Sequence, residues 1–208
     1  MARPRQVTDE QVLETAREVF MEHGPRAPVS MIAGRLGLSD AALFKRFGTK
    51  RELLLAAVMP PEEPPFMGLL QRPPVPGEVQ EQLVGISTGI VRLLKSMIPR
   101  ISILHAAGID PRQALRERYE VPPPIRVLRA LSAWIAAAKE AGALAPQVEP
   151  DATAMMIMGS LHFRAFLFGV IAPTAAPQCT QELPDPEAYA RQVVRSLWSG
   201  IAPNGAME

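Results

Sequence analysis

Clusters of proline divide this chain into blocks and limit the folds that are open to it. Seven of its 22 prolines stand at residues 60–76, and further clusters stand at 122–124, 146–150 and 173–186. A proline inside a helix removes a backbone donor and clashes with the preceding turn, so helices should end near these clusters. The blocks between them have helically spaced apolar residues, and none alternates as a strand does. The sequence therefore predicts an all-α fold.

The longest proline cluster also predicts the domain organisation. We expect an N-terminal helical domain in residues 1–59, a proline-rich connection in 60–77 and a larger helical domain in 78–208. A folded chain of this length buries about 70% of the surface that the unfolded chain exposes. A sizeable core is therefore expected without disulfides or metals.

Charge and cysteine content narrow the kinds of partner and the compartment. The chain has 22 Lys and Arg against 21 Asp and Glu, a formal net charge of +1, so any contact with nucleic acid must be local. The single cysteine, Cys179, allows no internal disulfide, and the first residues are charged rather than apolar. These features favour a reducing cytoplasm.

Motifs for catalysis or metal binding are missing from the sequence. The three histidines stand far apart, and no Gly-rich phosphate loop, Gly-x-Ser-x-Gly or His-Glu-x-x-His segment occurs. We therefore expect no enzyme activity, no metal and no cofactor. The apolar stretch 152–172 has His162 and Arg164 in its middle, which favours a helix buried on several faces over a membrane span.

The first 59 residues contain clear helix starts and stops. Thr8 with Gln11, and Thr49 with Glu52, have the spacing of a capping box, in which each side chain satisfies a free backbone amide of the first turn. Glycines 24 and 37 are placed as helix stops. The patterns predict four helices, which end near Gly24, cover about 29–36 and 40–47, and run from Thr49 to the prolines at 60 and 61.

The second and third of these helices have the spacing of a helix-turn-helix. Only residues 37–39 join them, and in this motif the second helix enters the major groove of DNA. With Leu43 and Phe47 facing inward, Asp40, Ala41, Phe44 and Lys45 point outward, and Arg46 and Lys50 lie at the flank. The alternative is a solvated helix face whose cations are incidental.

Residues 12–58 resemble the TetR family, the tetracycline-repressor-like bacterial transcription regulators. The resemblance rests on matches in order and spacing at Ala16, Phe20, Gly24, Val29, Ile32, Ala33, Gly37, Leu38, Ser39, Leu43, Phe44, Phe47, Lys50, Leu53 and Leu54. It implies a cytoplasmic homodimer that binds a near-palindromic DNA operator, most often as a repressor, and that a small-molecule effector releases. It also implies that the DNA-binding residues are Ser30, Ser39, Asp40, Ala41, Phe44, Lys45, Arg46 and Lys50.

In the family, the last two long helices form a dimer interface, and residues 78–208 would be the ligand-binding and dimerisation domain. We expect helices at about 78–97, 110–119, 124–143, 151–171 and, after the cap Asp185, 186–199. The residues spaced for the interface are Met155, Gly159, Phe163, Phe166, Val170, Tyr189, Val193, Leu197 and Trp198. The alternative for any one of them is ordinary core within one chain.

Methionine and histidine in the larger domain suggest an apolar ligand cavity. Met fills irregular shapes, and a histidine can anchor a ligand in an apolar pocket. The candidates for the lining are Met97, Ile101, His105, Trp134, Met156 and His162. The alternative is that these residues are simply core.

The proline connection should also affect how a ligand signal reaches DNA. Prolines 60 and 61 stop the fourth helix, which in the resembled family usually continues into the larger domain. We expect Phe66, Met67, Leu69 and Leu70 to pack as a short turn against the larger domain and to replace that helical lever.

Two other functions stay open at this point. A regulator of the same DNA-binding type could act without a small-molecule effector. A carrier of apolar ligands could have lost DNA binding, because Phe44 stands where the family usually has a tyrosine, and Ala42 and Pro28 replace common threonines.

Overall fold

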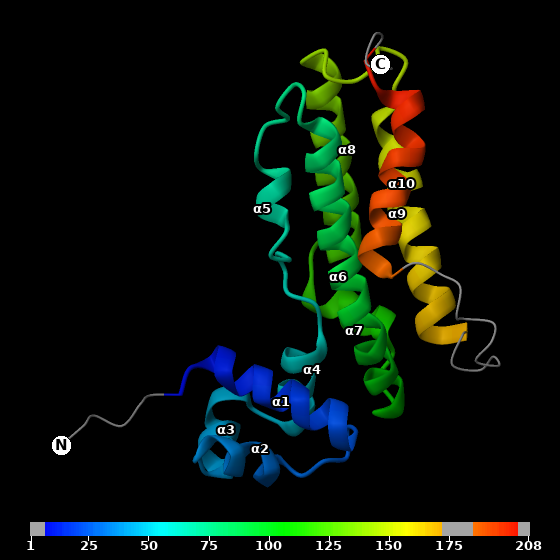
Figure 1. The fold of residues 1–208 in the computed structure, drawn as a ribbon. Helices are drawn as coiled ribbons and strands as arrows, with labels where there is room; N and C mark the ends of the chain where they lie inside the picture. The colour runs from blue at the N-terminus through cyan, green and yellow to red at the C-terminus, as the bar shows by residue number, and fades with distance from the viewer. Residues whose placement is uncertain (1–6, 172–184, 204–208) are drawn as a thin grey trace. The chain divides into compact units, whose positions relative to one another are not determined.

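The structure is a computed structural model that describes residues 7–171 and 185–203. Its first four helices are α1 (Asp9–His23), α2 (Val29–Leu36), α3 (Asp40–Phe47) and α4 (Lys50–Val58) (Figure 1). The later elements are α5 (Met67–Leu70), α6 (Val79–Ala106), α7 (Pro111–Arg118), α8 (Pro123–Glu140), α9 (Pro150–Phe166), the π-helical segment η1 (Leu167–Ile171) and α10 (Pro186–Ile201). The described residues include no strand, and the predicted all-α fold is confirmed. Cys179 lies outside the described residues.

Local sequence signals account for the ends of α1 to α4. Both predicted capping boxes form: Thr8 and Gln11 cap α1, and Thr49 and Glu52 cap α4, with side chain and backbone bonded in both directions. Gly37 ends α2 in the left-handed conformation, at φ 66° and ψ 29°, which glycine adopts without a steric penalty. The boundaries predicted for α2 and α3 are confirmed.

Helix α6 is longer than the sequence predicts. The expected end was near Met97, but the helix runs to Ala106 with Pro99 inside it. Pro99 is exposed, and apolar residues on both sides of it are buried, including Ile90 and Leu104. The lost backbone hydrogen bond is therefore outweighed by packing at both ends of the helix.

The chain divides into two compact units that are not consecutive in sequence. Unit 1 comprises residues 1–60 and 99–120, and unit 2 comprises residues 61–98 and 121–208. The core of unit 1 joins α1 to α4 with Leu104, Ile109, Ala114 and Tyr119. The hydroxyl of Tyr119 donates a hydrogen bond to the Pro60 carbonyl, which ties the end of α7 to the end of the α4 segment. The predicted boundaries of the N-terminal domain (1–59), the connection (60–77) and the larger domain (78–208) remain a proposal.

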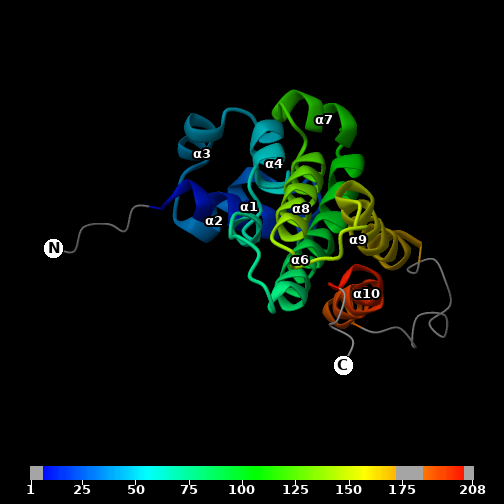
Figure 2. The ribbon, with the colours of Figure 1, turned by 90° about the horizontal axis from the view of Figure 1, so that it is seen from above.

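Unit 2 contains α5, most of α6, and α8 to α10. Helix α9 lies beside α8 and α10, as Figures 1 and 2 both show. Phe66 and Met67 are buried in the core of unit 2, and Leu69 and Leu70 pack against that core. The prediction that these four residues pack as a short turn against the larger domain is thus confirmed, whereas their role in signal transmission stays a prediction.

Candidate nucleic-acid interface

The α2–turn–α3 segment is built on a small buried core. Ile32 and Ala33 of α2 and Leu43 of α3 are almost fully buried in unit 1. Each large apolar side chain buried in this way contributes about 1.5–3 kcal/mol relative to an exposed one. Gly37 allows the tight turn between the two helices, so the outer face of α3 is fixed by the packing of its inner face.

The outer face of α3 carries the side chains that could contact base edges. Asp40, Ala41 and Lys45 are exposed, and Phe44 is 42% exposed, as predicted. The Ser39 hydroxyl accepts a hydrogen bond of 3.2 Å from the Ala42 backbone amide and so caps the helix. An exposed phenyl ring offers apolar contact, for example with a thymine methyl group, beside a lysine that can donate to guanine.

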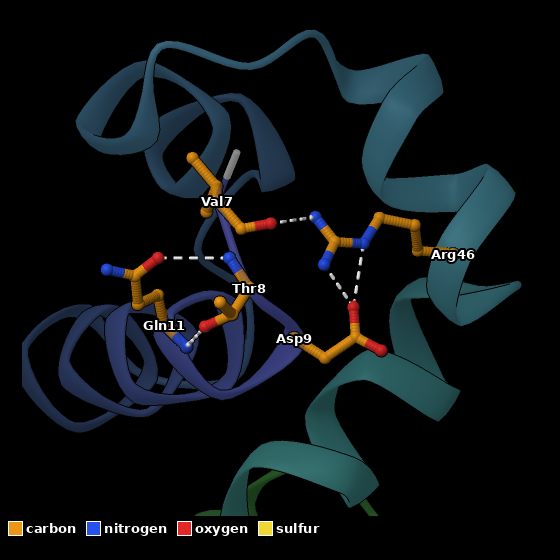
Figure 3. A network of polar contacts seen from close by, with 5 residues as sticks. All are labelled: Val7, Thr8, Asp9, Gln11 and Arg46. Atoms are coloured by element: carbon orange, nitrogen blue, oxygen red, sulfur yellow. Dashed lines mark hydrogen bonds and ion pairs between the residues drawn. The ribbon is translucent and has the colours of Figure 1, made fainter. Parts of the chain in front are cut away.

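Arg46 makes contacts that the sequence did not predict. Its Nε–H donates to Asp9 Oδ1 at 2.8 Å, Nη2 donates to the same oxygen, and Nη1 donates to the Val7 carbonyl at 3.0 Å (Figure 3). The Arg46 guanidinium also lies 5.8 Å from the centre of the Phe47 ring. The guanidinium expected at a phosphate is therefore already bonded to the start of α1.

Lys50 is the first residue of α4 and stands directly after the Thr49 cap. Two hydrogen bonds hold the neighbouring Glu52 carboxylate: the Thr49 backbone amide donates at 2.6 Å, and the Thr49 hydroxyl donates at 2.8 Å. These bonds, led by that of the backbone amide, lower the pKa of Glu52. Ser30, at the start of α2, is exposed.

Ion pairs engage some of the cations near α3 and leave two lysines there without one. Arg35 is engaged, because its Nη2 lies 2.7 Å from Glu22 Oε2, and this hydrogen bond is the main reason that the pKa of Glu22 is lowered. Among the residues that the structure describes, no ion pair engages Lys45 or Lys50. These two lysines are the best candidates for contact with an anionic partner.

A substitution at Gly48 tests the geometry of the turn between α3 and α4. Its φ of 77° and ψ of −107° suit glycine alone, and an added Cβ would lie 2.3 Å from Glu52 Oε2. Gly48→Ala should therefore lower the free energy of unfolding by about 1–3 kcal/mol. The control is Gly34→Ala in α2, where a Cβ meets nothing within 4 Å and alanine favours the helix. Chemical denaturation that shows equal stability for the two variants would contradict the strained turn.

The predicted interface residues of α9 and η1 lie on an exposed apolar face of unit 2. Met155, Gly159, Phe163, Phe166 and Val170 are all exposed, and Phe163 is 63% exposed. The predicted residues of α10 differ, since they are half-buried and pack against the core of unit 2: Tyr189, Val193, Leu197 and Trp198. Exposed apolar residues that follow one another along a helix face are typical of an interaction surface.

The residues predicted to line a ligand cavity do not share one unit. Ile101 and His105 are exposed residues of unit 1, and the other four belong to unit 2. Trp134 is buried and donates a 2.9 Å hydrogen bond to the Arg72 carbonyl. Met97 and His162 are half-buried, and Met156 is exposed.

A hollow in unit 2 has none of these residues in its wall. Its volume is about 600 Å³, and its wall comprises Ala136, Lys139, Glu140, Gly142, Leu144, Pro146, Pro150 and Pro203.

In the described part of the chain, no group of three or more His, Cys, Asp or Glu could hold a metal ion. The helical stretch Pro150–Ile171 is long and apolar enough to cross a membrane by length and composition, with a mean hydropathy of 1.6.

Comparison with known proteins shows what this geometry is similar to. Residues 12–57 match the model of the bacterial regulatory proteins of the tetR family. No curated protein matches the chain. Three similar solved structures are a transcriptional regulator of the TetR/AcrR family from Thermobifida fusca YX-ER1, the flavonoid-responsive regulator FrrA, and SmeT, the repressor of the Stenotrophomonas maltophilia multidrug efflux pump SmeDEF.

The three structures share the fold of this chain at low identity. The Thermobifida regulator is 18% identical with a TM-score of 0.61, and the match covers 96% of this chain and 98% of that one. FrrA is 20% identical with a TM-score of 0.55, covering 93% and 96%. SmeT is 20% identical with a TM-score of 0.58, covering 98% and 94%. Residues 12–57 thus match the helix-turn-helix of the tetR family, and the chain shares its fold with these three solved structures.

Proposed function

We propose that this protein is a homodimeric transcription repressor that binds a near-palindromic operator and is released by a small apolar effector in the cytoplasm. The observation that carries the proposal is the outer face of α3, where Phe44 and Lys45 are exposed on a helix-turn-helix. In this proposal Asp40 and Ala41 complete the surface for base edges, Ser39 caps the recognition helix, and Ser30 and Lys50 contact phosphates. TetR-family regulators are DNA-binding transcription regulators, which supports this assignment.

The experiment compares two lysines on an operator obtained by selection from random DNA. Lys50→Ala removes one phosphate contact per subunit, so affinity should fall on all sequences and the salt dependence should flatten by about two units per dimer. Lys45→Ala should instead change which bases are preferred. The control is Lys95→Ala, an exposed lysine of α6 in unit 2. A Lys50→Ala variant with the wild-type salt slope would remove Lys50 from the DNA contacts.

The exposed face of α9 supports the dimer. Met155, Gly159 and Phe163 are spaced four residues apart, and Phe166 and Val170 continue the same stripe. Gly159 has open space around it, which would allow a second helix to approach closely. We expect two copies of α9 to bury this face together, with α10 completing a four-helix interface through Tyr189, Val193, Leu197 and Trp198.

The proposed small-molecule effector is supported by what two of the similar proteins respond to or control. FrrA is flavonoid-responsive, and SmeT is the repressor of a multidrug efflux pump. The proposed lining includes Met97, Trp134, Met156 and His162, and the His162 Nδ1 lies 3.1 Å from the Met158 carbonyl. The further candidates Ile101 and His105 lie in unit 1. Native mass spectrometry of purified dimer should detect a retained small molecule.

Two alternatives are separated by the same measurements. Dimer that binds operator but retains and responds to no small molecule would be a regulator without an effector. Protein that retains an apolar ligand but binds no DNA would be a carrier, an idea that the exposed Phe44 in place of tyrosine keeps open.

A further inference from the structure

Arg46, near the end of the recognition helix α3, is bonded to the start of α1. Its Nε donates to Asp9 Oδ1 at 2.8 Å, Nη2 donates to the same oxygen, and Nη1 donates to the Val7 carbonyl at 3.0 Å (Figure 3). Because the guanidinium is planar and its N–H groups point in fixed directions, these bonds set the direction of their acceptors as well as the distance. The contact thus fixes the C-terminal end of α3 relative to the N-terminal end of α1.

Few other side chains fix the orientation of α3. Of its eight residues, all of which the structure describes, only Leu43 is buried, and the half-buried Phe47 packs against the same core. Both lie on the inner face, so the helix can still turn about the line that joins them. Arg46 stands about 100° around the helix from Phe47, and its bonds act to one side of that line. Arg46 is therefore placed to oppose this rotation.

The orientation of α3 matters because its first turn carries Asp40 and Ala41, which are proposed to face base edges. Eight residues at a rise of 1.5 Å make the helix about 12 Å long. A tilt of about 10° at its C-terminal end would therefore move the first turn by roughly 2 Å. Binding groups must be held to within about 0.5 Å, because hydrogen bonds weaken steeply beyond their normal geometry. An anchor at Arg46 can thus decide how well α3 contacts bases.

The same contact makes Arg46 a poor phosphate ligand. Each of its three guanidinium nitrogens already donates to an oxygen of the chain, and a DNA phosphate nearby would also lie close to the negative charge of Asp9. The Asp9 side chain is 69% exposed, and an ion pair this exposed adds little to stability. The contact can therefore be broken by substitution without unfolding the domain.

We propose that Arg46 positions the recognition helix instead of binding DNA. Through Asp9 and Val7, it sets the angle at which α3 presents its outer face to base edges. The inference rests on the DNA-binding function proposed above. Breaking the contact should lower affinity for the operator far more than affinity for unrelated DNA, because unrelated DNA is bound through its phosphates and not through its bases.

Asp9→Ala distinguishes the two roles by the sign of its effect on operator binding. If Arg46 bound a phosphate, loss of the carboxylate would free the guanidinium and raise affinity for all DNA. If Arg46 positions α3, affinity for the operator should fall about tenfold, which is a typical cost of one mismatched base pair, while affinity for unrelated DNA is unchanged or rises. Fluorescence anisotropy at one salt concentration measures both affinities. A rise in operator affinity would overturn the proposal.

The matched control is Glu10→Ala. Glu10 is the next residue of the same helical turn and is exposed, and within residues 7–171 and 185–203 no ion pair engages it. Its substitution removes the same charge from nearly the same place but leaves the Arg46 contact intact. The ratio of operator affinity to unrelated-DNA affinity should therefore stay at the wild-type value. Equal ratios for Asp9→Ala and Glu10→Ala would contradict a positioning role.

Arg46→Lys tests the other side of the contact. Lysine keeps the charge for a phosphate but cannot form three bonds in one plane, so the affinity ratio should again fall about tenfold. The double variant with Asp9→Ala should be no worse than either single variant, because both changes break one contact. A wild-type ratio for Arg46→Lys, or losses that add in the double variant, would refute the proposal.

Thermal unfolding separates these effects from loss of the fold. The variants should unfold close to the wild-type midpoint, because Leu43 and Phe47 still hold α3. If Asp9→Ala loses the start of α1, Arg46→Lys decides alone, since it lies outside that helix. Wild-type protein that binds no DNA contradicts the regulator itself, whereas an operator bound with the same ratio by wild type and both variants contradicts the positioning role alone.

Discussion

Phe163→Glu should convert the protein from a dimer to a monomer and abolish operator binding. Phe163 is 63% exposed in the single chain, so the change costs the subunit little. In the proposed interface, each unpaired charge costs several kcal/mol. At about 3 kcal/mol per copy and two copies per dimer, the dissociation constant should rise about ten-thousandfold.

Sedimentation velocity measures this change, and the control is Ile125→Glu. Ile125 is an exposed apolar residue of α8, 44% exposed, outside the proposed interface. The Ile125→Glu variant should remain dimeric. The predicted residue Leu197 is a poorer choice, because it packs against the core of its own unit. An intact Phe163→Glu dimer would mean that the apolar face of α9 serves another contact.

Gly89→Ala should destabilise unit 2, whereas Gly85→Ala should not. A Cβ on Gly89 would lie 2.4 Å from Phe66 Cβ and 2.6 Å from its Cγ, but one on Gly85 meets only Leu69 Cδ1 at 3.9 Å. Phe66 Cβ is bonded to the backbone, so α5 must move away from α6. Overpacking of this kind costs about 1–3 kcal/mol, and loss of the Phe66 packing raises the cost toward 3–5 kcal/mol.

Urea unfolding should therefore show Gly89→Ala at least about 2 kcal/mol less stable than Gly85→Ala, which gains helix propensity. Equal midpoints would contradict the close packing of Phe66. In the effector-responsive regulator proposed here, the displaced α5 should also weaken release from DNA, since a ligand acts only through contacts that differ between two states.

Local features of the sequence predicted most of the DNA-binding helices. The capping boxes at Thr8 and Thr49 and the glycine stop at Gly37 each act within a few residues, so their patterns can be recognised without the fold. The outer face of α3 followed from the burial of Leu43, because helix periodicity fixes which residues point away.

Contacts between distant residues could not be predicted in this way. Asp9 and Arg46 are separated by 37 positions, and nothing near Arg46 in the sequence distinguishes an anchored guanidinium from one that binds phosphate. The extension of α6 past Pro99 depends on burial of Leu104 in unit 1, which overrides the local effect of a proline. The residues proposed to line a ligand cavity fall in both units for a related reason, because residues 99–120 pack with the N-terminal helices.

The central claim is that α3 contacts bases as part of a two-fold dimer. Selection of binding sites from random double-stranded DNA by the wild-type protein tests it most directly. We expect a two-fold symmetric sequence whose half-sites lie one helical turn, about 34–36 Å, or a multiple of it, apart. Enrichment of an asymmetric sequence, or no enrichment at physiological salt, would contradict it.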